Sequence, residues 1–249
     1  MRTTAIFGRE NEIAELSERF SRRRSFLIHG PAGAGKTLLV KQVGPGRRDL
    51  LYCPDSSTGQ TIFQAIASAL FRANDRVMTA ACGRAGLEAL RKKSAVAMRG
   101  IVTNALQGGS YQLVLDHFQS PSRALAGAVK DLLTASGTPL VAVARSPHME
   151  DIGFLRSLFS ARGELFAIHD FDPPTAKEFA LYRAQLMTLE GSNRDEAIAK
   201  IVNYSHGNPG AIVMMLNMAA EPRYVSQSHI KLGPLYVDFK LHWNGIYGH

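Results

Sequence analysis

The chain has 249 residues, of which 45% are hydrophobic and 20% are charged, and its net charge is +8. This composition is ordinary for a globular protein. No apolar run reaches the length of a membrane-spanning helix, and the first residues lack the apolar core of a secretion signal. The two cysteines, Cys53 and Cys82, are too few for a disulfide framework or a cysteine metal site. We therefore expect a cytoplasmic protein.

The positive charge has two explanations. An excess of Lys and Arg is compatible with a polyanionic partner such as DNA or RNA. The basic residues form only short clusters at 22–24, 47–48 and 91–93, which are also explained as solvated helix ends and loops. DNA is therefore a candidate partner that charge alone does not establish.

Helical and strand patterns alternate along the first two thirds of the chain. Strands separated by helices form a parallel sheet with helices on both faces, which predicts an α/β three-layer sandwich over residues 1–171. The predicted helices cover 11–20, 36–43, 59–73, 86–106 and 121–136, and the predicted strands cover 25–29, 49–55, 111–118, 138–146 and 164–171.

The last third of the chain has a different character. Residues 172–220 contain helical patterns and no strand pattern, which predicts a small helical lid. In the tail, residues 221–249, an alternation of apolar and polar residues from Val237 to Trp243 predicts a strand with one apolar face. That strand has two candidate partners, which are its own core and the sheet edge of a partner or neighbouring subunit.

A phosphate-binding loop (P-loop) follows the first predicted strand. It reads GPAGAGKT and matches the pattern G-x-x-x-x-G-K-[ST] in full. The glycines let backbone N–H groups face phosphate oxygens, Lys36 would reach the β- and γ-phosphates, and the Thr37 hydroxyl would ligate Mg²⁺. We therefore predict ATP or ADP with Mg²⁺ as cofactors of a P-loop fold. The predicted nucleotide-binding residues here are Gly30, Pro31, Ala32, Gly33, Ala34, Gly35, Lys36, Thr37 and Leu38.

A second nucleotide motif ends the third predicted strand. Leu113 to Asp116 is an apolar run that ends in a carboxylate, and we predict that Asp116 holds the Mg²⁺ shell with Thr37. Many P-loop ATPases place a Glu directly after this Asp to polarise the attacking water, whereas this chain has His117. An imidazole can accept a proton near neutral pH, so His117 is the candidate base of slow or partner-dependent hydrolysis.

Three arginines are candidates for contact with the γ-phosphate. Arg145 lies at the end of the fourth predicted strand, where it would distinguish ATP from ADP. Arg156 and Arg162 lie in the next segment, where either could act as an arginine finger on a neighbouring subunit. A plain surface position is the alternative for Arg145 and the favoured explanation for Arg156 and Arg162.

Two further motifs resemble the AAA+ ATPases of the initiator and STAND (signal-transduction NTPase) groups. IFGRENEIAEL, residues 6–16, is similar to their Gly-Arg-Glu box, and the resemblance implies that Gly8 and Arg9 lie against the adenine. SHGNPGAI, residues 205–212, resembles the Gly-x-Pro motif of the STAND lid, in which the proline, here Pro209, packs on the base. Local structure also explains this motif, because Gly207 can end one helix while Asn208 caps the next.

The resemblance implies an ATP-driven switch in which ATP and ADP set the lid angle and often the oligomeric state. Small relatives of this type include transposition helper proteins, which act on DNA beside a transposase. We expect a protein partner or self-oligomer, and any output domain on another chain. The second hypothesis is a nucleotide-gated scaffold that hardly hydrolyses ATP, which His117 favours. A kinase-like phosphotransferase is a third hypothesis, which the order of the motifs disfavours.

Overall fold

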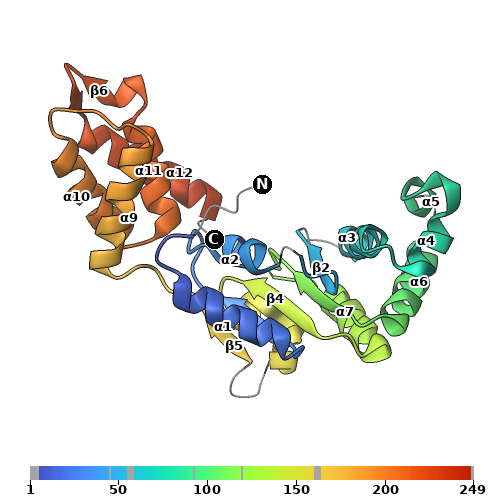
Figure 1. Cartoon of the computed structure of the whole chain (residues 1–249). Helices are drawn as coiled ribbons and strands as arrows, with labels where there is room; N and C mark the ends of the chain where they lie inside the picture. The colour runs from blue at the N-terminus through green and yellow to red at the C-terminus, as the bar shows by residue number, and fades with distance from the viewer. Residues whose placement is uncertain are drawn as a thin grey trace. The chain divides into compact units, whose positions relative to one another are not determined.

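The structure is a computed structural model that describes residues 6–44, 46–54, 59–91, 93–118, 120–159 and 164–247. The chain divides into two compact units, each assembled from separate stretches of sequence (Figure 1). The sheet unit comprises Asn11–Gly30 and Lys36–Ala167. The helical unit comprises Pro31–Gly35, Ile168–His249 and the described part of Met1–Glu10. The P-loop is therefore divided between the two units.

The sheet unit is built on five parallel strands in the order β2-β3-β4-β1-β5. Parallel strands that are buried on both faces read as continuous apolar runs, and β3 and β4 are buried at every position. This arrangement confirms the predicted α/β fold. The strands are β1 (Phe26–His29), β2 (Leu50–Cys53), β3 (Gln112–Leu115), β4 (Leu140–Ala144) and β5 (Leu165–Ala167).

Helices cover both faces of this sheet and make the sandwich three layers thick. Leu27 and Leu113 face a large core shared with α3, α6 and α7. On the opposite face Phe26 packs against Phe20 of α1, with ring centroids 5.5 Å apart. The elements of these layers are α1 (Glu10–Ser21), α2 (Lys36–Val43), α3 (Gly59–Arg72), α4 (Arg76–Cys82), η1 (Gly83–Ala85), α5 (Glu88–Arg91), α6 (Ala95–Gly108), α7 (Arg123–Ser136), α8 (Met149–Ile152) and η2 (Gly153–Phe159).

The single helix predicted over 86–106 is wrong, because this segment contains α5, a break and α6. Ser94 starts α6, where its hydroxyl accepts a hydrogen bond from the Ala97 N–H at 3.2 Å. The backbone of Ser94 is extended, as is typical of an N-cap residue, so α6 starts anew and does not continue α5. The short α4, which Asp75 caps through the Met78 N–H, had no counterpart in the prediction.

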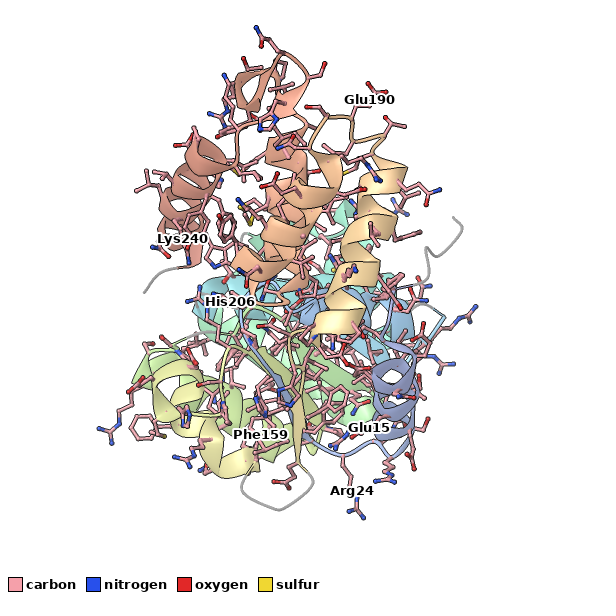
Figure 2. All side chains as sticks on the ribbon, turned by 90° about the vertical axis from the view of Figure 1, so that its left-hand side faces the viewer. Glu15, Arg24, Phe159, Glu190, His206 and Lys240 are labelled. Atoms are coloured by element: carbon pink, nitrogen blue, oxygen red, sulfur yellow. The ribbon has the colours of Figure 1, made fainter. Side chains whose placement is uncertain are left out.

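The helices of the helical unit pack around one core (Figures 1 and 2). Small residues of α9, namely Ala176, Ala180 and Ala184, are fully buried and allow the neighbouring helices to approach closely. Figure 2 labels His206, the C-cap of α10, and Lys240 of α12. The elements are α9 (Pro173–Leu186), α10 (Arg194–Ser205), α11 (Pro209–Ala219), η3 (Pro222–Tyr224), β6 (Val225–Ser226), β7 (His229–Ile230) and α12 (Leu232–Tyr247).

The strand predicted in the tail is wrong, because residues 232–247 form the helix α12. Phe239 and Trp243 are four residues apart, pack against each other and face the core of the helical unit. Val237 and Leu241, also four residues apart, are exposed on another side of the helix. The alternation of apolar and polar residues therefore comes from two helical stripes.

No helix in the described ranges combines the length and the apolar character that crossing a membrane requires.

Candidate functional site

The sheet unit contributes the ends of the P-loop. Gly30 follows β1, and its N–H donates to the Arg145 carbonyl oxygen at 3.1 Å, which joins the loop to the end of β4. Lys36 begins α2 and its Nζ donates to the Gly30 carbonyl oxygen at 2.7 Å. Thr37 follows on the same helix, while Leu38 is 59% exposed. Lys36 therefore lies across the loop, where an ammonium group can reach a bound phosphate.

Asp116 occupies the centre of the metal site predicted from the sequence. Its side chain is 1% exposed and follows β3 directly. The Thr37 hydroxyl donates to Oδ1 at 3.2 Å, and the His117 N–H donates to the same oxygen at 2.8 Å. A hydroxyl that gives its proton to a carboxylate keeps its lone pairs for a cation, and Mg²⁺ prefers such oxygen ligands. The residues present therefore fit a magnesium ion.

The structure adds Tyr52, which the sequence did not indicate. Tyr52 lies on β2, and its hydroxyl donates to Oδ2 of Asp116 at 2.7 Å. Burial raises the pKa of Tyr52 above its ordinary value, and the hydrogen bond to Asp116 and the charge of this carboxylate raise it further. The phenol is therefore neutral and remains a donor.

His117 is close to the predicted metal site, but its ring faces solvent. Its side chain is 63% exposed, and Nε2 lies 4.0 Å from Oδ2 of Asp116. The backbone has a φ of +53°, a left-handed conformation that few non-glycine residues adopt. Such strain persists where the surroundings impose it, and here Asp116 binds the His117 N–H.

The three candidate arginines differ in their positions. Arg145 is half-buried directly after β4, beside the first residue of the P-loop. Arg156 is exposed in η2 and lines a pocket of about 660 Å³ in the sheet unit. Arg162 lies outside the described residues. Arg145 is thus the one of the two described candidates that joins the P-loop.

The helical unit contributes the middle of the P-loop, which the SHGNPGAI motif contacts directly. The Asn208 side-chain amide donates to the Ala32 carbonyl oxygen, and the Gly210 N–H donates to the Gly33 carbonyl oxygen at 3.0 Å. Gly33 has a φ of +80°, and Cη2 of Trp243 lies 2.9 Å from the point that a Cβ would occupy there. The motif and α12 therefore both touch the loop backbone.

Pro209 itself has a local structural role. It is half-buried and is the first residue of α11. It directly follows Asn208, whose side-chain oxygen caps the helix by accepting the Ala211 N–H. Gly207 has a φ of +81°, and a Cβ at this position would collide with the Phe171 carbonyl oxygen. The turn is therefore shaped by its own packing, and Asn208 and Gly210 on either side of Pro209 link it to the P-loop.

Gly8 and Arg9 belong to the helical unit, and Arg9 is buried. Arg9 is 4% exposed, and its Nη2 donates to the carbonyl oxygens of Ala34 at 3.3 Å and His169 at 2.6 Å. The guanidinium lies 4.4 Å from the centroid of the Phe171 ring. Arg9 therefore joins the P-loop to the start of the helical segment.

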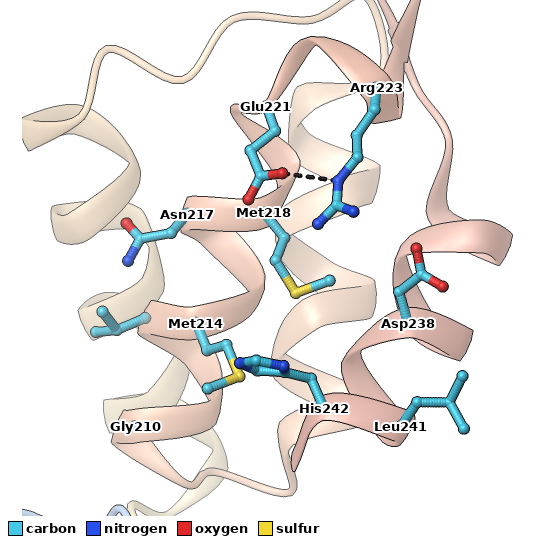
Figure 3. A pocket seen from close by; sticks show the side chains of 10 residues that line it. Gly210, Met214, Asn217, Met218, Glu221, Arg223, Asp238, Leu241 and His242 are labelled. Carbon is cyan, nitrogen blue, oxygen red and sulfur yellow. Dashed lines mark hydrogen bonds and ion pairs between the residues drawn. The ribbon is translucent and has the colours of Figure 1, made fainter. Parts of the chain in front are cut away.

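A pocket of about 840 Å³ lies between α11 and α12 in the helical unit (Figure 3). Met214 and Met218 line it from α11, and Leu241 and His242 line it from α12. Its rim carries the ion pair between Glu221 and Arg223, in which Nε and Oε2 are 2.7 Å apart. No sequence pattern predicted this pocket, because its walls come from helices that only the fold brings together.

A P-loop motif directly after the first strand of a five-stranded parallel sheet is characteristic of P-loop nucleotide-binding folds. A family model described as the AAA ATPase domain matches residues 5–144. Because this match spans more than half of the sequence, the chain belongs to the AAA ATPase domain family. The family assignment confirms the expected resemblance to AAA+ ATPases. No curated protein matches the sequence.

Solved structures share the fold at low sequence identity. The Walker-type ATPase PABY2304 of Pyrococcus abyssi is 17% identical with a TM-score of 0.65, over 97% of this chain and 73% of that chain. Orc1 of Aeropyrum pernix, solved in complex with DNA, is 15% identical with a TM-score of 0.64, over 96% and 66% of the two chains. A STAND protein of Pyrococcus horikoshii with a tetratricopeptide repeat sensor is 16% identical with a TM-score of 0.51, over 97% and 33%. At these identities the likeness concerns the fold alone.

Proposed function

We propose that this AAA ATPase domain binds ATP with Mg²⁺, hydrolyses it slowly and changes its interaction with a partner according to the bound nucleotide. The observation that carries the proposal is the hydrogen bond between Thr37 and the buried Asp116. In such a site a magnesium ion would neutralise charge on the phosphates. Thr37 and Asp116 would hold the ion, and the P-loop N–H groups and Lys36 would hold the phosphates.

The switch is supported by the contacts of the P-loop within the helical unit. Asn208 and Gly210 bind the carbonyl oxygens of Ala32 and Gly33, next to the N–H groups that would hold the phosphates. A loop that reshapes around a nucleotide alters these hydrogen bonds. The nucleotide state would thus be transmitted to α11 through these hydrogen bonds.

DNA is the proposed polyanionic partner of this switch, alongside a protein partner or a second copy of the chain. The net charge of +8 favours association with a polyanion. The solved Orc1 with the same fold was captured on DNA. These observations support DNA as the first partner to test.

A second function, a nucleotide-gated scaffold with little hydrolysis, is supported by His117. The residue directly after Asp116 is His117 and not a carboxylate, and its ring is largely exposed. Water that an exposed side chain contacts is hard to hold in line for attack. In this case bound ATP would stabilise an assembly.

The deciding experiment is phosphate release from ATP and Mg²⁺, with and without duplex DNA, for wild type and Lys36→Ala. Lys41→Ala serves as the matched control, because Lys41 is an exposed lysine on the same helix. Turnover that rises with DNA and disappears only in Lys36→Ala supports the switch. Tight ATP binding without turnover in either condition supports the scaffold, and no ATP binding by wild type refutes both.

A further inference from the structure

Tyr52 and Asp116 come from neighbouring strands whose backbones are joined. In the ladder of β2 and β3, Cys53 lies opposite Leu115, and the Asp116 N–H donates to the Cys53 carbonyl oxygen at 2.9 Å. Tyr52 points to the other face of β2 from Cys53, because side chains alternate along a strand. This register brings the phenol hydroxyl to 2.7 Å from Oδ2 of Asp116.

The Asp116 carboxylate is thus held through both of its oxygens. Oδ1 accepts hydrogen bonds from the Thr37 hydroxyl and the His117 N–H, and Oδ2 accepts one from Tyr52. Rotation of the carboxylate about its Cβ–Cγ bond would break contacts on both sides. Metal ligands generally accept or donate hydrogen bonds that fix their orientation, and these hydrogen bonds would fix that of Asp116.

We propose that Tyr52 is a positioning residue for magnesium, because it holds Asp116 in the orientation in which this carboxylate and Thr37 would bind the ion. The inference rests on the proposed function, since it assigns Tyr52 a role at the same site. Tyr52 would influence the Mg²⁺ dependence of nucleotide binding, while binding of metal-free nucleotide would not depend on it. A tyrosine that only satisfied a buried carboxylate would affect stability alone.

The test uses Tyr52→Phe, which removes one hydroxyl and keeps the ring. Tyr111→Phe is the matched control, because the Tyr111 hydroxyl also donates to an aspartate, Oδ2 of Asp75, at 3.0 Å and in the same unit. ATP affinity is measured by calorimetry in EDTA and over a series of Mg²⁺ concentrations. In parallel, the electron paramagnetic resonance spectrum of Mn²⁺ with ATP reports the ligand sphere of the ion.

We expect Tyr52→Phe to raise the Mg²⁺ concentration needed for half-maximal affinity about ten- to hundredfold, as the loss of a partner that orients a metal ligand typically does. In EDTA its ATP affinity should stay within about twofold of wild type. Its Mn²⁺ spectrum should differ from that of wild type, whereas Tyr111→Phe should match wild type in all three measurements.

A Tyr52→Phe protein with the Mg²⁺ dependence and Mn²⁺ spectrum of wild type overturns the inference. A lower melting temperature in both variants without a metal effect overturns it as well and assigns Tyr52 a structural role. If wild type binds ATP, either result leaves the proposed function intact. If wild type binds no ATP, the proposed function fails, and this inference fails with it.

Discussion

The Asn208 side-chain amide donates to the Ala32 carbonyl oxygen at 2.8 Å, so the residue that caps α11 also holds the P-loop. The same amide nitrogen donates to Oδ1 of Asp170, and the side-chain oxygen accepts the Ala211 N–H. Asn208 is buried, so each of these groups would lack water if its partner were removed. One side chain therefore combines helix capping with shaping of the loop.

We expect Asn208→Ala to lower the free energy of unfolding by about 2 kcal/mol, because it removes a cap and two further hydrogen bonds. Asn208→Ser should recover about half of this loss, because serine caps a helix but has no amide. The measurement is urea denaturation, with Asn217→Ala as the exposed control on the same helix. If the serine variant is as stable as wild type, the bonds to Ala32 and Asp170 contribute nothing.

Trp243 should report nucleotide binding through its fluorescence. It is the only tryptophan in the sequence, and Cη2 lies close to Gly33 in the middle of the P-loop. Phosphate binding to the loop changes the surroundings of the indole, so we expect a shift in the emission of at least several nanometres or a change in intensity. ATP titration of wild type tests this, with Lys36→Ala as the control that should show no change. Calorimetric ATP binding with unchanged emission would contradict the prediction.

His117→Glu should accelerate hydrolysis. It places a carboxylate directly after Asp116, and general bases typically contribute about 10²–10⁴-fold, so we expect phosphate release to rise at least about tenfold. Gln has the same shape as Glu, but its amide cannot act as a base. His117→Gln should therefore hydrolyse ATP more slowly than wild type. The left-handed backbone at His117, with a φ of +53°, would strain Glu and Gln alike, so the comparison of these two variants isolates the chemistry. An unchanged rate in His117→Glu would place the cause of slow turnover elsewhere.

The cap of α9 should make stability depend on acidity. The Thr175 hydroxyl and its N–H donate to Asp172 and lower the pKa of this carboxyl below its ordinary value. A lowered folded-state pKa contributes stability that is present above the unfolded-state value of about 4 and is lost as the pH falls through the folded-state value. Asp172→Asn keeps a good cap without this charge. We expect the variant to melt below wild type at pH 7 and the difference to shrink towards pH 3. A difference that is constant between these two pH values would contradict the assignment.

Local patterns were sufficient to predict much of the fold and part of the site. The P-loop motif predicted the turn before α2 to the residue, because its chemistry depends on residues within one loop. Asp116 was found because it ends an apolar run, and the parallel sheet followed from alternating helices and strands. Each of these signals is contained in a short stretch of sequence.

The remaining features depend on contacts between distant residues. Tyr52 and Asp116 are 64 positions apart in the sequence and meet only through the register of β2 and β3. Asn208 and Ala32 are 176 positions apart. The tail was misread because a few alternating residues fit both a strand and two helical stripes. Burial distinguishes the two, and burial is a property of the folded chain.

The connection between Arg9 and His169 has a consequence for the order in which the protein forms during synthesis. These residues are 160 positions apart, and their hydrogen bond belongs to the helical unit. At about 5–20 residues per second, a ribosome needs roughly 8–30 s to extend the chain from one to the other. The sheet unit ends at Ala167, so its whole sequence is made before His169 is added. Arg9 thus leaves the ribosome before the sheet unit but meets its partner only after it, and nascent chains stalled before the end of α12 should carry a sheet unit without a completed helical unit.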